Sequence, residues 1–208
     1  MDYLRDPEAI YQASFATIRA EAKLDSIAPE LRDVAIRLIH ACGMTDLAAD
    51  FRGDARLPGA VRAAIAGGCP IITDCEMARA GIITRFLPPN ARLLCPLNDP
   101  RTAELAKSLN TTRSAAAVEL WKPELAGAVI VIGNAPTALF ALLEAIDAGA
   151  PKPAAIIGLP VGFVGAAESK AELHANPRAI PHVTVLGRRG GSAMASAALN
   201  AIMLGARP

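Results

Sequence analysis

Short aliphatic runs that alternate with helical segments constrain the fold of this chain more than any other feature. The runs are too short for helices, are bounded by Gly, Pro or Asn, and occupy residues 70–73, 92–95, 128–132, 154–159 and 182–186. Continuous apolar strands that alternate with helices are typical of a parallel sheet covered on both faces. We therefore expect one α/β domain over residues 1–208, Rossmann-like in the broad sense, with a mainly parallel sheet flanked by helices.

Additional helices are expected in front of the first strand. Asp6 is a cap residue before Pro7, and a helix should follow over residues 7–22. A second helix over residues 29–42 has apolar residues at helical spacing and ends at Gly43. A third is expected over residues 58–66.

The composition favours a large aliphatic core and a second subunit. Of the 208 residues 52% are hydrophobic, which excludes disorder, but only 4% are aromatic. Some apolar surface should therefore be covered by another copy, and we expect a homodimer.

The four cysteines form no metal-binding spacing and are typical of reduced thiols, so that no metal site is expected. Because the N-terminus lacks signal-peptide features and no apolar run is long enough to span a bilayer, we expect a cytoplasmic protein without a membrane partner.

The charge distribution favours a small anionic ligand over nucleic acid. The net charge is only +1, which argues against a general nucleic-acid binder. Residues 151–208 nevertheless contain six Lys and Arg against two Glu. This basic segment is typical of an anion-binding region, although a solvated charged surface has the same composition.

Several loops that follow the strands have features of anion sites. In "GNAPT" (133–137) Gly133 allows close backbone approach, and a helix over 137–148 should begin with free amides. "GRRGGSAMA" (187–195) precedes a helix that we expect Ser192 to cap. Neither loop completes a dinucleotide or P-loop fingerprint, so a nucleotide enzyme is disfavoured.

Two further segments combine polar residues with loop or helix starts. "GLPVGFVGAAESK" (158–170) is a glycine-rich loop followed by Ser169 and Lys170, and an ordinary connection would fit the same letters. In "NTTRSAAAVELW", Thr111 or Thr112 should cap a helix with Arg113 in its first turn, the end at which the helix dipole disfavours a cation. An arginine there suggests a bound anion, and a simple surface arginine is the alternative.

His40 is the candidate acid–base residue. It lies in "RLIHACG", in the last turn of a helix, where the dipole favours imidazolium. The other histidines, His174 and His182, have no second metal ligand at useful spacing, and no GxSxG nucleophile motif is present. Proton chemistry in a cleft is what remains, with an idle surface histidine as the alternative.

The longer motifs make the chain similar to a known family. The strings "RLIHACGM", "DPRT", "NTTRSAAAVELW", "GNAPTALF", "PVGFVGAAESK" and "GGSAMA" resemble precorrin-8X methylmutases of the aerobic cobalamin pathway over essentially the whole chain. The resemblance implies an isomerase without a metal or organic cofactor. It implies that precorrin-8X becomes hydrogenobyrinate by methyl migration between adjacent carbons of ring C, with His40 protonating the ring nitrogen.

The same resemblance implies the substrate-binding residues and the partners. The implied substrate contacts are Ser14, Thr112 and Arg113 near His40, Asp74 and Glu76 in the same cleft, Asn134 at a strand end, and Gly162, Phe163, Ser169 and Lys170 in another wall. The expected partners are a metal-free tetrapyrrole substrate and the next enzyme of the pathway, which would receive the product. A non-catalytic carrier of corrinoid intermediates is the alternative function.

Overall fold

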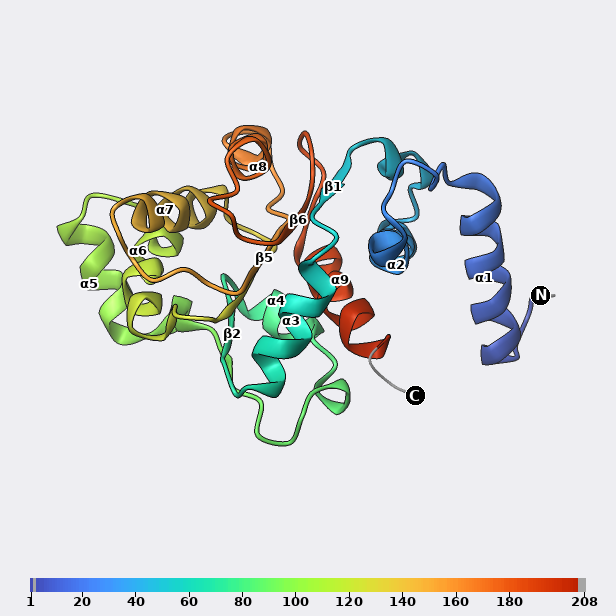
Figure 1. Ribbon diagram of the computed structural model, residues 1–208, viewed down its shortest axis with the longest axis horizontal. Coiled ribbons are helices and arrows are strands. Elements are labelled where there is room, and N and C mark those ends of the chain that lie inside the picture. The colour runs from blue at the N-terminus through green and yellow to red at the C-terminus, as the bar shows by residue number, and fades with distance from the viewer. Residues whose placement is uncertain (2, 206–208) are drawn as a thin grey trace.

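The computed structural model describes residues 1 and 3–205, which contain a six-stranded sheet in the order β1-β6-β5-β4-β2-β3 (Figure 1). The strands are β1 (Phe51–Gly53), β2 (Ile71–Thr73), β3 (Leu93–Leu94), β4 (Val129–Ile132), β5 (Ala155–Gly158) and β6 (His182–Val185). Strands β2 to β6 pair in parallel, while β1 is antiparallel to β6. The predicted α/β class and mainly parallel sheet are confirmed, as are the five predicted strand positions. The remaining residues of the predicted 1–208 domain, 2 and 206–208, lie outside the described part.

Helices surround the sheet (Figure 1). They are α1 (Pro7–Glu21), α2 (Arg32–Cys42), α3 (Leu57–Ala66), α4 (Glu76–Gly81), α5 (Pro100–Ser108), α6 (Arg113–Trp121), α7 (Pro136–Asp147), α8 (Ala166–Ala175) and α9 (Ser192–Leu204). Short 3-10 turns lie at Pro29–Leu31, Thr45–Ala49, Thr84–Phe86, Pro96–Asn98 and Lys122–Glu124. None of the helices in the described ranges is long and apolar enough to cross a bilayer.

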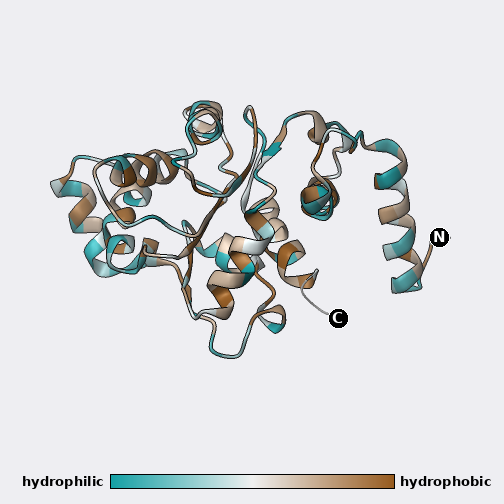
Figure 2. Ribbon diagram, in the orientation of Figure 1, coloured by the Kyte–Doolittle hydropathy of each residue, from teal (hydrophilic) through white to brown (hydrophobic). Residues whose placement is uncertain are grey.

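Both faces of the sheet are buried because successive strand residues point to opposite sides. In β4, Val129 and Val131 pack into a core shared with α2, α3 and α9, whereas Ile130 and Ile132 pack into a core shared with α6, α7 and α8. All four residues are fully buried. Figure 2 shows the central strands coloured as hydrophobic, in agreement with this two-sided burial.

The helix boundaries follow the local signals except at α9. Asp6 accepts a hydrogen bond from the Glu8 N–H (3.2 Å), and Gly43 ends α2 with a left-handed φ of 70°. The second predicted helix begins with a 3-10 turn before α2. The prediction that Ser192 caps α9 is wrong: Gly191 is the cap residue, and Ser192 is already helical with its Oγ 3.3 Å from Cys75 Sγ.

The edge strand β1 and the position of α1 were not predicted. Strand β1 joins the sheet beside β6 through only three residue pairs, from Phe51↔Val185 to Gly53↔Val183. Helix α1 packs against α2 and lies at the opposite end of the molecule from α5 and α6 (Figure 1). The contact between α1 and α2 builds the site described next.

Candidate active site

His40 contacts Ser14 where α1 packs against α2. The distance between Ser14 Oγ and His40 Nδ1 is 3.0 Å, a hydrogen bond between residues 26 positions apart in the chain. His40 is exposed and lines an open cavity of about 260 Å³ together with Ser14, Gly43 and Thr45. If the Ser14 oxygen accepts the Nδ1 proton, Nε2 is the ring nitrogen left to exchange a proton with a ligand.

Phe15 is buried between α1 and α2 next to His40. Its buried ring lies 5.0 Å from the His40 ring, centroid to centroid. The guanidinium carbon of Arg37 lies 4.8 Å from the Phe15 ring centre, and Arg37 Nη2 donates to the Tyr11 hydroxyl at 2.5 Å. Sequence reasoning missed Phe15 and Arg37 as supports of the site; the spacing of Tyr11 and Phe15, four residues apart on one helix face, was the available signal.

An apolar cavity of about 380 Å³ adjoins the C-terminal end of α2. We call it the corrin cavity, after the substrate class that the sequence resemblance implies; its lining residues are Ala41, Cys42, Met44, Val161, Gly162, Phe163, Arg188, Arg189, Gly190, Ala193 and Met194. Ala41 and Cys42 directly follow His40, so that the cavity and the histidine share one end of α2. Phe163 is 85% exposed, and the Arg188 guanidinium lies 5.3 Å from its ring centre. Two of the predicted substrate residues, Gly162 and Phe163, therefore lie on this wall.

Asp74 is buried at the end of β2 and binds backbone amides of the protein itself. Its Oδ1 accepts from the Gly133 N–H (2.9 Å), and its Oδ2 accepts from the N–H groups of Asn134 (2.9 Å) and Ala135 (2.7 Å). The amides ahead of α7, expected to be free for a ligand anion, are thus occupied by the protein's own carboxylate. The backbone at Gly133 does lie close to another group, as predicted, but that group is α9 of the same chain: an added Cβ would lie 2.7 Å from Ser192 Cα.

Thr112 and Arg113 are at the start of α6, which packs on the sheet face opposite to α2. Thr112 Oγ1 accepts from the Ala115 N–H (3.1 Å), which confirms it as the cap, and lies 2.8 Å from Thr137 Oγ1. Arg113 donates to the carbonyl oxygen of Leu97 and to Asn98 Oδ1, each at 3.0 Å. Within one chain this pair is not brought to His40.

Glu76 and Asn134 have more exposed positions. Glu76 begins α4 and forms an ion pair with Arg79 at 2.6 Å. The Asn134 residue is exposed, while its backbone N–H is bound to Asp74. Neither residue is close enough to Ser14 or His40 for a hydrogen bond between described side chains.

Ser169 and Lys170 are fully buried in α8. Ser169 Oγ donates to the Ala166 carbonyl (3.2 Å) within the same helix. Lys170 Nζ donates to the Arg189 carbonyl at 2.5 Å, directly behind the loop that lines the corrin cavity. The Arg189 side chain pairs with Asp46 (2.8 Å) and Asp50 (2.6 Å). Lys170 therefore supports the cavity wall from behind, whereas the hydroxyl of Ser169 bonds only within α8.

The buried Lys170 should make stability depend on alkaline pH. Burial lowers its pKa to about 8, from 10.5, against the opposing charge of Asp50. Between about pH 8 and pH 10.5 the unfolded chain binds more protons at this lysine, so the contribution of Lys170 to the free energy of unfolding should rise with pH, by about 3 kcal/mol across the window. Urea unfolding should therefore show that the difference in the free energy of unfolding between the natural protein and Lys170→Met changes by this amount over the same pH range. Parallel curves for both proteins would contradict the assignment.

The fold and the site together define a class of protein. An exposed histidine, oriented by a serine, lies next to an apolar cavity whose rim contains arginine, on a parallel α/β scaffold. These are the features of an enzyme that performs proton chemistry on an apolar substrate with anionic groups.

Comparison with known proteins identifies the family. The family model described as CbiC, precorrin-8X methylmutase, matches residues 9–204. A precorrin-8X methylmutase from Pseudomonas aeruginosa is 55% identical over 97% of both chains. A cobalt-precorrin-8 methylmutase from Priestia megaterium is 37% identical over 95% of this chain and 88% of the relative. A crystal structure of precorrin-8X methyl mutase from Thermus thermophilus is 36% identical, with a TM-score of 0.83 and 95% coverage of each chain.

The chain belongs to the precorrin-8X methylmutase family and is an isomerase that acts by methyl migration.

Proposed function

We propose that this protein converts precorrin-8X to hydrogenobyrinate, with His40 as the proton donor to the ring C nitrogen. The observation that supports this role is the 3.0 Å contact between Ser14 Oγ and His40 Nδ1 beside the corrin cavity. A hydroxyl that accepts the Nδ1 proton fixes the orientation of the ring and leaves Nε2 to carry the transferred proton.

The proton changes the electronic state of the substrate. A proton on the ring C nitrogen makes the conjugated system poorer in electrons, which favours migration of the methyl group to the adjacent carbon. Substrate and product are isomers, so the product must release one proton after the methyl group has migrated, and this proton restores His40 for the next turnover. The exposed position of His40 allows solvent to relay it.

The corrin cavity suits one face of a flat, apolar macrocycle. Phe163 and Met194 supply apolar contact, and the glycine-rich loop allows backbone to approach closely. Arg188 has no carboxylate within ion-pair distance among the described residues and can bind an acetate or propionate group. In this proposal Asp74 holds the loop before α7 and Lys170 holds the loop at Arg189, while Ser169 is a buried residue of α8.

The metal-free macrocycle is the proposed substrate. The relative named for precorrin-8X is 55% identical to this chain, whereas the one named for the cobalt-containing compound is 37% identical. Parallel assays with both compounds should give faster turnover with the metal-free one; a preference for the cobalt compound would contradict the proposal.

A homodimer would complete the site, and this forms a second part of the proposal. Helix α1 has only Phe15 and Ile18 buried among its 15 residues, and apolar side chains of the same helix, such as Ile10 and Tyr11, are exposed. His40 and Arg113 are on elements that pack on opposite faces of the sheet, so a second copy is needed to bring them together.

Free thiols at all four cysteines agree with a cytoplasmic location.

Sedimentation velocity should therefore show a dimer, and mixing two inactive variants tests the shared site. His40→Ala and Arg113→Ala, each inactive alone, should regain activity in mixed dimers that contain one intact site. A monomer, or mixed dimers without regained activity, would contradict the proposal.

The carrier hypothesis predicts a different number of precorrin-8X molecules changed per site from the number that an enzyme would change. An enzyme converts many equivalents of precorrin-8X to the hydrogenobyrinate spectrum, whereas a carrier changes the spectrum of one equivalent per site. Delivery of the product to the next enzyme of the pathway stays a prediction.

A further inference from the structure

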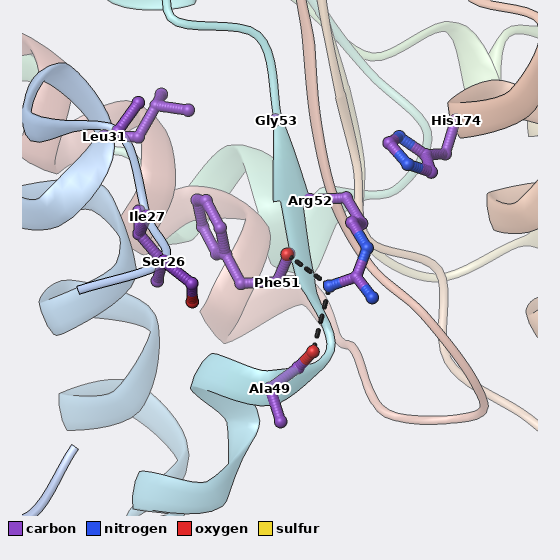
Figure 3. A pocket seen from close by; sticks show the side chains of 9 residues that line it. Ser26, Ile27, Leu31, Ala49, Phe51, Arg52, Gly53 and His174 are labelled. Carbon is purple, nitrogen blue, oxygen red and sulfur yellow. Dashed lines mark hydrogen bonds between the residues drawn. The ribbon is translucent and has the colours of Figure 1, made fainter. Parts of the chain in front are cut away.

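A third cavity, of about 420 Å³, lies at the open edge of the sheet, where β1 ends. We call it the edge cavity. Its wall is formed by residues between α1 and α2, including Leu31, by Ala49 at the end of the turn before β1, by β1 itself, and by His174 on α8 (Figure 3). Gly53 of β1 pairs with Val183 at the N-terminal end of β6, so the cavity is remote from the strand ends that carry the corrin cavity.

Arg52 offers a fixed positive charge to the edge cavity. Its Nη1 donates to the carbonyl oxygens of Ala49 (2.9 Å) and Phe51 (2.8 Å), which holds the guanidinium in place (Figure 3). The other guanidinium N–H groups have no hydrogen-bond partner within the described ranges. No carboxylate of those residues lies within 4.0 Å. A guanidinium held in this way is preorganised for a ligand anion.

A buried histidine nitrogen without a partner lies on the same face of the sheet. Arg52 pairs with Thr184, and His182 is two residues before Thr184, so the side chains of Arg52 and His182 are diagonal neighbours. His182 is 5% exposed, and its Nε2 has no hydrogen-bond partner. Its ring lies 5.8 Å from the ring of His174, which lines the edge cavity. Buried polar atoms without a partner are rare and point to a missing ligand or solvent molecule.

The chemistry of this cluster favours an anion over a metal ion. Among the residues that the structure describes, no three His, Cys, Asp or Glu side chains are grouped as metal ligands, and the Arg52 guanidinium would repel a cation. Asp54, the neighbouring carboxylate, is engaged by Arg56 at 2.5 Å. Ile27, Leu31 and Phe51 also line the cavity, but their side chains are buried in the core on the opposite side of β1 from Arg52 and His174.

We propose that the edge cavity binds a small carboxylate or phosphate anion on the side of β1 that carries Arg52. Arg52 and His174 bind the anion, with His182 behind them as a further donor once it is protonated. This site is separate from the proposed isomerase site and does not depend on that function.

Binding should take up a proton at His182. Burial lowers the pKa of His182, and the charges of His174 and Arg56 act in the same direction, while Asp54 and the contact with the Ile180 carbonyl act against it. Arg52 adds another positive charge on the same face. A bound anion offsets these cations and favours the imidazolium, so affinity should rise as pH falls through the range in which histidine titrates.

Imidazole NMR resonances of the full chain provide the test, with benzoate and phenyl phosphate as probes and benzamide as the uncharged control. Saturable shifts of the His174 and His182 signals are expected with both anions and not with benzamide, and benzoate should bind more tightly at pH 6 than at pH 8. Arg52→Gln should weaken binding at least about tenfold. Lys107→Gln, which removes an exposed cation on α5, should leave binding unchanged.

Three results would overturn the proposal: no saturable shift with either anion, equal shifts with benzamide, or full affinity in Arg52→Gln. If Arg52→Gln does not fold, His174→Gln on the exposed side of α8 provides the same comparison.

Discussion

Replacement of His40 by alanine is expected to lower the turnover of precorrin-8X by about 10²–10⁴-fold, the range that a general acid contributes. The variant should fold normally because His40 is exposed and lies in the last turn of α2. It should also bind hydrogenobyrinate, because the corrin cavity begins at Ala41 and lacks a wall contact from His40. Absorption spectroscopy measures conversion, and titration with the product measures binding.

Two substitutions on α1 make the result specific. Ser14→Ala removes the hydrogen bond to His40 Nδ1 and should lower turnover less than His40→Ala, since the imidazole stays in place. Gln12→Ala, which removes an exposed contact to Glu8 on the same helix, should have no effect. Near-normal turnover in His40→Ala would exclude it as the proton donor.

Replacement of Asp74 by alanine is expected to lower the free energy of unfolding by about 3–5 kcal/mol, because three backbone N–H groups lose their acceptor and each costs about 1–3 kcal/mol when buried without a partner. The Asp74 carboxylate accepts from three backbone amides ahead of α7, and alanine leaves all three without a partner. Urea unfolding followed by circular dichroism measures the change.

Matched variants separate this contact from an ordinary cap. Asp74→Asn keeps one acceptor oxygen but places an amide N–H against backbone donors, so its loss should be substantial and smaller than that of alanine. Asp99→Ala removes an exposed cap of α5, which accepts from the Arg101 N–H at 3.0 Å, and should cost about 1 kcal/mol. An Asp74→Ala loss no larger than that of Asp99→Ala would show that the buried contact is unimportant.

The sheet could be predicted because strands buried on both faces are continuous apolar runs. The run at 128–132 contains β4, and the other four runs contain β2, β3, β5 and β6. Strand β1 could not be predicted, because "FRG" has neither an apolar run nor alternation over a useful length. It is a strand only because β6 offers an edge to pair with.

The sequence indicated which residues belong to the site, but it did not indicate which residues they contact. His40 stood out through its place at a helix end, but its partner Ser14 is 26 residues away and meets it only when α1 packs on α2. Asp74 and the amides after β4 were each recognised, yet their pairing depends on β2 and β4 being neighbours in the sheet. Lys170 was expected to face a ligand, and its complete burial follows from the loop at Arg189 folding over it.

Helix α1 is attached weakly enough that the contact between Ser14 and His40 can be lost while the rest of the protein stays folded. Ser14 reaches His40 through a helix held on α2 mainly by Phe15 and Ile18, whereas His40 belongs to a helix packed deep in the core. Release of α1 is a local opening that costs far less than global unfolding. Warming or mild denaturant therefore frees the imidazole from its orienting hydroxyl while the sheet stays intact, and the temperature range over which the histidine is correctly oriented is narrower than the range over which the protein is folded.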